Sequence, residues 1–107
     1  MPQDREYVWL VDVTGKAKKQ KEKLPPDIKA AFDLLEFELK TDGPERLNWP
    51  HYGLVAGKGK NVDMRHCHLN KPRPCYVAVW VVTDPDNRFM EICYVGTHEN
   101  ADYRRIN

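Results

Sequence analysis

Residues 75–83 constrain the fold of this chain more than any other segment. Their sequence, CYVAVWVVT, is apolar on both faces of an extended strand, which is typical of a strand in the middle of a sheet. The next four residues, DPDN, form a turn signal with proline at the second position. Residues 89–95 read as a second apolar strand, so the two segments predict an antiparallel hairpin.

Two helices are predicted upstream of this hairpin. Residues 16–24 form a short lysine-rich segment that Thr14 can cap, and prolines at 25 and 26 end it. The second helix is the clearest element, because Gly43 stops a run in which apolar side chains recur along one face of a 3.6-residue helix. These apolar positions are Ile28, Phe32, Leu35 and Leu39.

The remaining strands complete the predicted fold. Residues 6–13 are aromatic and β-branched and predict a first strand, and residues 62–69 predict a strand before the hairpin. Residues 44–60 are interrupted by proline and glycine and are expected to be irregular. We predict an α+β fold of order β-α-α-β-β-β, with a small antiparallel sheet, two helices packed on one face and the other face free.

Length and composition limit the class of protein. A chain of 107 residues predicts a single domain over residues 1–107, and 41% hydrophobic with 31% charged residues fits a soluble globular protein. No apolar run of about 18 residues occurs, and residues 1–6 lack the pattern of a secretory signal. We therefore expect a cytoplasmic protein with no membrane partner. The three cysteines are expected to be reduced, buried thiols.

Positive charge gathers in the middle of the chain although the net charge is only +1. A local positive patch attracts polyanions, and arginine binds two phosphate oxygens at once. The alternative is an ordinary solvated sheet edge. Residues 16–23 hold five more lysines, which either contact an RNA backbone or form a solvated helix face. The basic residues of the central patch are Lys58, Lys60, Arg65, Lys71 and Arg73.

Two histidines in the predicted strand at 62–69 are candidate binding residues. Side chains alternate along a strand, so His66 and His68 share one face while Arg65 and Cys67 share the other. Such a pair can bind zinc, but no C-x-x-C or H-x₃₋₅-H spacing accompanies it. We predict no metal site and no cofactor.

The polar segment after residue 95 carries a possible acid–base pair. His98 titrates near neutral pH and Tyr103 can donate a hydrogen bond, and the two converge if the segment turns back along the sheet. The alternative is a frayed terminus in which Tyr103 packs for its ring area.

The sequence as a whole resembles a known group of toxins. The element order, DMR at residues 63–65, HCHLNKPRPCYVAVW at residues 66–80, and YVGTHE at residues 94–99 followed by Tyr103 are similar to the RelE/ParE toxin superfamily, particularly its cytotoxic translational repressors. The resemblance implies a toxin of a type II toxin–antitoxin system, bound by a cognate antitoxin. It further implies an mRNA interferase, an endoribonuclease that cuts mRNA in the ribosome without a metal, the ribose 2′-OH attacking the adjacent phosphate.

The resemblance also implies roles for individual residues. Arg65 and Arg73 would hold the phosphate, while His98 and Tyr103 would transfer protons or stack on a base. Other implied RNA-binding residues are Lys58, Lys60, His66, His68 and Lys71. Family members often carry an arginine where this chain has Val77. Two alternatives therefore stay open: a non-nuclease toxin such as a ParE-like gyrase inhibitor, or an inactive nucleic-acid- or protein-binding module.

Overall fold

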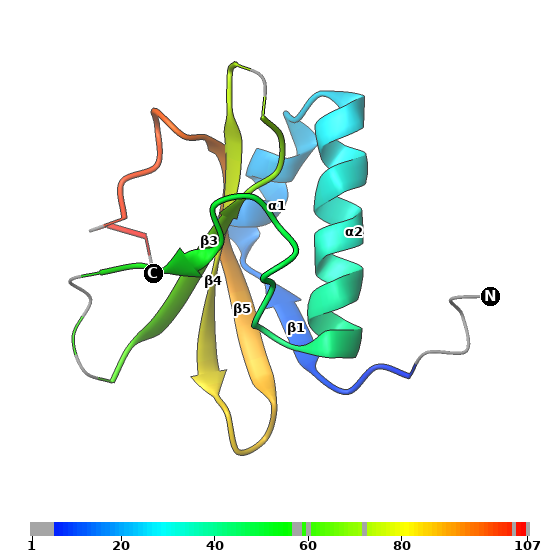
Figure 1. Ribbon diagram of the computed structural model, residues 1–107, viewed down its shortest axis with the longest axis vertical. Coiled ribbons are helices and arrows are strands. Elements are labelled where there is room, and N and C mark those ends of the chain that lie inside the picture. Colours follow the sequence, from blue (N-terminus) through cyan, green and yellow to red (C-terminus); the bar gives the residue numbers. More distant parts are fainter. Residues whose placement is uncertain (1–5, 57–58, 60, 72, 104, 107) are drawn as a thin grey trace.

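The computed structural model describes residues 6–56, 59, 61–71, 73–103 and 105–106. The elements follow the order β1 (Leu10–Val13), α1 (Gly15–Glu22), α2 (Pro26–Asp42), β2 (Gly53–Leu54), β3 (Asp63–His68), β4 (Tyr76–Asp84) and β5 (Phe89–Thr97). The strands form one sheet of order β1-β5-β4-β3-β2, and both helices lie on one side of it (Figure 1). The predicted α+β fold is confirmed.

The sheet is mixed, because β1 runs parallel to β5 while the other neighbours are antiparallel. The predicted first strand is shortened at its start. The backbone N–H groups of Val8 and Trp9 donate to the Lys40 carbonyl at the end of α2 instead of to the sheet. β2 is a two-residue edge strand inside the segment that the sequence predicts to be irregular.

Helix α2 forms where the periodic pattern predicts it and supplies much of the core. Pro26 occupies its first turn, where a missing N–H costs nothing, and Gly43 ends it with a φ of 93°. Its apolar stripe is buried against the sheet, where Phe32 and Trp80 are fully buried. On α1, the Thr14 hydroxyl accepts a hydrogen bond from the Ala17 N–H at 3.2 Å, which confirms the predicted cap.

The face of the sheet opposite the helices is not free, contrary to expectation. The C-terminal segment lies beside this face (Figure 1). Ala101, Tyr103 and Ile106 pack against a second cluster of buried side chains. The alternation of a central strand explains this, because β4 is apolar on both faces and both need cover. The second cluster consists of Met64, Val77, Val79, Val81, Cys93 and Tyr94.

The cysteines divide into two kinds. All three are free thiols, and Cys67 and Cys93 are buried as expected, whereas Cys75 is only half-buried. Burial raises the pKa of Cys67 to about 12, so this thiol stays protonated. Within the described part of the chain, no helix is long and apolar enough to cross a membrane.

Candidate functional site

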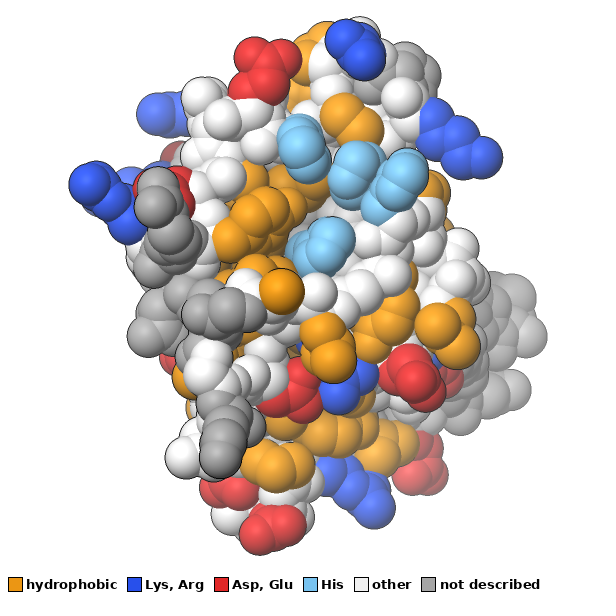
Figure 2. Space-filling view, turned by 60° about the vertical axis from the view of Figure 1, so that its left-hand side comes forward, with side chains coloured by type: hydrophobic (Ala, Val, Ile, Leu, Met, Phe, Trp, Pro, Cys, Tyr) orange, Lys and Arg blue, Asp and Glu red, His pale blue; other side chains and the backbone are white. Residues whose placement is uncertain are grey.

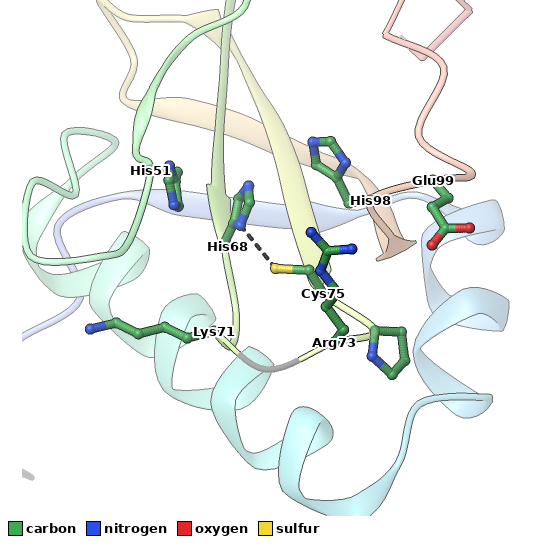
Figure 3. Close-up of a pocket in the computed structure, with 8 residues that line it drawn as sticks. His51, His68, Lys71, Arg73, Cys75, His98 and Glu99 are labelled. Carbon is green, nitrogen blue, oxygen red and sulfur yellow. Dashed lines mark hydrogen bonds between the residues drawn. The ribbon is translucent and has the colours of Figure 1, made fainter.

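A cleft of about 550 Å³ opens beside the strand ends where β3 finishes and β4 begins. Figure 3 shows its side chains, which come from the loop before β2, the end of β3, the β3–β4 connection and the segment after β5. Its size suits a nucleotide or another small anion. The cleft is lined by His51, His68, Lys71, Arg73, Pro74, Cys75, His98 and Glu99.

Backbone pairing brings these distant segments together. The His98 N–H donates to the Cys75 carbonyl at 2.8 Å, which continues the β4–β5 ladder beyond Thr97. The His68 N–H donates to the Pro50 carbonyl at 2.8 Å, which fixes the loop that carries His51. Strand registers therefore set the positions of the cleft side chains.

The chain's four histidines gather around this cleft. The ring centroids of His51 and His68 are 4.3 Å apart, and those of His68 and His98 are 5.3 Å apart. Figure 2 shows the histidines together on one face, around a hollow beside exposed apolar side chains. His66, which shares the His68 face of β3, completes the group. Several imidazoles around one anion-sized cleft can donate and accept protons.

Electrostatics favour the neutral form of two of these imidazoles. Burial lowers the pKa of His66, and the nearby imidazoles of His98 and His51 lower it further. The pKa of His68 is lowered by burial and then by His51, His98 and His66. Neutral imidazole can accept a proton, so the cluster contains candidate general bases.

A thiol orients His68. Cys75 Sγ lies 3.0 Å from His68 Nδ1 and donates to the Asn70 carbonyl at 3.1 Å. With its proton directed at Asn70, the sulfur can accept a hydrogen bond from Nδ1, which leaves Nε2 as the acceptor. A fixed tautomer is what a general base requires.

His98 and Tyr103, which the sequence analysis treats as a pair, both lie at or next to the cleft, but they make different contacts. His98 lines the cleft, whereas the Tyr103 ring packs next to it, with its centroid 5.5 Å from that of His66. Burial raises the pKa of Tyr103, so the phenol stays protonated. The segment that carries both residues folds back along the sheet instead of extending away from it.

Arg65 lies outside this cleft. Its guanidinium makes a bidentate pair with the Asp63 carboxylate, at 2.8 and 3.0 Å, and donates to the Tyr52 hydroxyl at 2.8 Å. These hydrogen bonds, that to Asp63 foremost, raise the pKa of Arg65 despite its burial. The alternation of β3 turns it to the helix side, away from His66 and His68.

The other basic residues that the sequence predicts to bind RNA form two groups: two line the cleft, and two lie outside the described residues. Lys71 and Arg73 line the cleft, and Figure 3 shows the Arg73 guanidinium near Cys75 and His98 while the Lys71 side chain extends away from them. Lys58 and Lys60 lie outside the described residues. Sequence reasoning did not name His51, Cys75 or Glu99 as site residues. Cys75 and Glu99 lie within the segments that carry the resemblance, whereas His51 lies in the segment expected to be irregular and belongs to no motif. Among the residues that the structure describes, no group of three or more His, Cys, Asp or Glu side chains is arranged to hold a metal ion.

The depressed pKa values predict a pH-dependent stability. Because His66 binds its proton less readily when folded, the unfolded chain takes up more protons below about pH 6.5. The contribution of neutral His66 to the free energy of unfolding is therefore fully present above that pH, and it is lost as the pH falls toward the pKa of His66 in the folded chain. Each unit of pKa difference corresponds to about 1.4 kcal/mol.

His66→Phe tests this linkage, since phenyl keeps the ring and cannot titrate. We expect the urea midpoint of the wild type to fall between pH 7.5 and 5.5, and to fall less in His66→Phe. At pH 7.5 the variant also removes a buried Nδ1 that has no hydrogen-bond partner among the described residues. An equal fall in both proteins would show that His66 does not contribute.

Comparison with known proteins identifies the fold. No protein-family model matches the chain, and no curated protein matches it. Among the solved structures that are similar to this chain are two of RelE proteins. The archaeal RelE from the RelE–RelB complex of Pyrococcus horikoshii OT3 has a TM-score of 0.68 and 16% identity, over 87% of this chain and 98% of that one. An arginine double mutant of free Escherichia coli toxin RelE has a TM-score of 0.59 and 16% identity, over 87% and 86%. The chain therefore has a RelE-like fold.

Proposed function

We propose that this chain, with its RelE-like fold, is a single-domain toxin of a type II toxin–antitoxin system that cleaves mRNA on the ribosome in the cytoplasm. The observation that carries this proposal is the cleft that Arg73, Lys71 and the imidazoles of His68 and His98 line. Cleavage of a phosphodiester needs cations at the phosphate, a base and an acid, and this cleft offers all three.

The cations of the cleft bind the reacting phosphate. Arg73 donates two parallel N–H groups to the non-bridging oxygens, and Lys71 adds a mobile positive charge at the rim. Their attraction grows as negative charge develops on the phosphorane, so they stabilise the transition state more than the bound substrate.

The imidazoles transfer the protons. His68 Nε2 accepts the proton of the ribose 2′-OH as the O2′–P bond forms. His98, in its protonated form, donates a proton to the leaving O5′ as the P–O5′ bond breaks. The products are a 2′,3′-cyclic phosphate and a free 5′-hydroxyl. The centroid separation of 5.3 Å keeps both rings within reach of the same phosphodiester.

The remaining predicted residues receive supporting roles. Tyr103 and His66 offer ring faces on which an unstacked base rests. Arg65, whose donors are engaged by Asp63 and Tyr52, acts as a positioning residue for β3 rather than at the phosphate. A cognate antitoxin is the expected protein partner, by analogy with the RelE that was solved together with RelB.

Arg73→Ala tests the proposal in cells. Induced expression of the wild type should produce cuts in ribosome-bound mRNA that primer extension detects. Loss of the phosphate fork should reduce the cleavage rate by about 10²–10³-fold. Arg73→Lys, which keeps the charge and loses the fork, should recover part of that rate.

Arg88→Ala is the matched control for this experiment. Arg88 lies in the turn between β4 and β5, about 25 Å or more from the Arg73 end of the nine-residue strand β4. We expect its variant to cut at the wild-type rate. Growth arrest with no cuts in the wild type would favour the gyrase-directed or binding alternatives instead.

A further inference from the structure

The lysine-rich helix α1 borders a second cavity that the cleavage site does not use. β1 ends opposite Ile92, so no strand of the described residues borders the rest of β5 on that side, and α1 covers this edge. The Gln20 side-chain oxygen accepts a hydrogen bond from the Val95 N–H at 3.2 Å, which joins the helix to the edge. A groove of about 390 Å³ is left, lined by Lys16, Gln20, Lys23, Leu24, Tyr76, Tyr94, Val95, Gly96, Thr97 and Asn100.

The groove adjoins the histidine cleft. Cys75 and His98 line the cleft, while their chain neighbours Tyr76 and Thr97 line the groove. Tyr76 and Thr97 are directly paired in the β4–β5 ladder, so one pair of strand ends separates the two cavities. Successive side chains of a strand face opposite sides of the sheet, so the cleft and the groove lie on either side of these strand ends. A single RNA strand that bends around the strand ends can therefore have one unit in the cleft and the next in the groove.

The lining of the groove matches single-stranded RNA. Lys16, Gln20 and Lys23 lie at i, i+4 and i+7 and share one helix face, which places two exposed ammonium groups along it. Neither lysine forms an ion pair with another described residue, and none of the described lining residues is acidic. These charges suit successive phosphates of one backbone.

The groove also offers groups for a sugar or base. The Thr97 hydroxyl oxygen is buried and has no hydrogen-bond partner among the described residues. A buried hydroxyl normally has a partner, so its lack of one is consistent with a ligand that supplies it. The half-buried ring of Tyr76 provides a surface for stacking.

We propose that this groove binds the nucleotide adjacent to the scissile phosphate in single-stranded RNA. The inference rests on the proposed function, since it extends the RNA path out of the cleft. Lys16 and Lys23 contact the phosphate, Tyr76 stacks on the base, and the Thr97 hydroxyl hydrogen-bonds the nucleotide.

The test compares RNA length between matched variants. Binding of a dinucleotide and a tetranucleotide, each with a 2′-deoxy sugar at the attack position to prevent cleavage, is measured by titration calorimetry at low salt. In the wild type the longer RNA should bind about tenfold more tightly. Lys16→Ala/Lys23→Ala should reduce that ratio to about one. Lys18→Ala/Lys19→Ala removes equal charge from exposed residues of α1 that do not line the groove, and should keep the wild-type ratio.

The outcomes separate this inference from the proposed cleavage. Equal ratios in the two double variants, or no gain from length in the wild type, overturn the groove assignment. Reduced antitoxin affinity with an unchanged RNA ratio also overturns it and makes the groove a protein-docking site. A length gain that depends on Lys16 and Lys23 supports the groove even if primer extension finds no cuts, in which case only the cleavage proposal fails.

Discussion

His98→Ala is expected to reduce the single-turnover cleavage rate of ribosome-bound mRNA by about 10²–10⁴-fold, the usual contribution of a positioned acid or base. His68→Ala should have a comparable effect. Both imidazoles line the cleft beside Arg73, and losing either leaves one proton of the reaction without a transfer partner. Rates are measured by quenching the reaction and quantifying cut mRNA by primer extension.

Non-additivity distinguishes a paired mechanism from two separate structural defects. If His68 and His98 act on one transition state, the double variant should be little worse than the poorer single variant. Independent damage to folding would instead multiply the two losses. As the pH is lowered, the wild-type rate should fall at a lower pH than it would for an ordinary imidazole base with a pKa of about 6.5, because burial lowers the pKa of His68.

His66→Ala is the matched control for these variants. His66 lies on the same strand and the same face as His68, but it does not line the cleft and its ring faces Tyr103. We expect a loss below about tenfold, the scale of a single weakened base contact. A loss as large as that of His98→Ala would contradict the assigned proton transfers.

Sequence patterns correctly predicted the helices and strands whose conformation depends mainly on their own residues. The stripe from Ile28 to Leu39 specifies α2 whatever it packs on, and the two-sided apolar run of β4 requires cover on both faces. β2 could not be predicted in this way. Two residues carry no period, and Gly53 and Leu54 are extended because they pair with His66 and Arg65. The parallel pairing of β1 likewise depends on a strand about 80 positions later in the sequence.

In the candidate site, too, some features could be predicted from nearby sequence and others depend on distant contacts. Alternation along β3 correctly separated His66 and His68 from Arg65. The spacing of Asp63 and Arg65 also places both on one strand face, a signal that could have predicted their ion pair. No pattern in the nearby sequence predicts that His51 lies beside His68, because contacts with distant parts of the chain fix the loop before β2. That loop therefore depends on residues far from the cleft.

Glu38→Ala is expected to lower the free energy of unfolding by about 2–4 kcal/mol. One carboxylate oxygen of Glu38, on α2, accepts hydrogen bonds from Arg46 at 3.0 Å, Asn48 at 3.0 Å and the Trp49 indole at 2.8 Å. Burial opposes its ionisation, yet these hydrogen bonds lower the pKa of Glu38 overall. Removing the carboxylate leaves the largely buried Arg46 guanidinium without this partner and frees the segment that leads to His51.

Two further variants separate the network from a simple loss of charge. Glu36→Ala, on the same helix, breaks one ion pair with Lys40 and should cost about 0.5 kcal/mol or less. Glu38→Gln keeps an acceptor oxygen and should lose about half as much stability as Glu38→Ala. Urea unfolding followed by tryptophan fluorescence measures all three. Because the Glu38 network fixes the loop before His51, Glu38→Ala should also slow cleavage at temperatures where the chain remains folded. Wild-type stability in Glu38→Ala would mean that the 44–52 loop is held by its apolar contacts alone, and the cleft geometry would then not depend on this carboxylate.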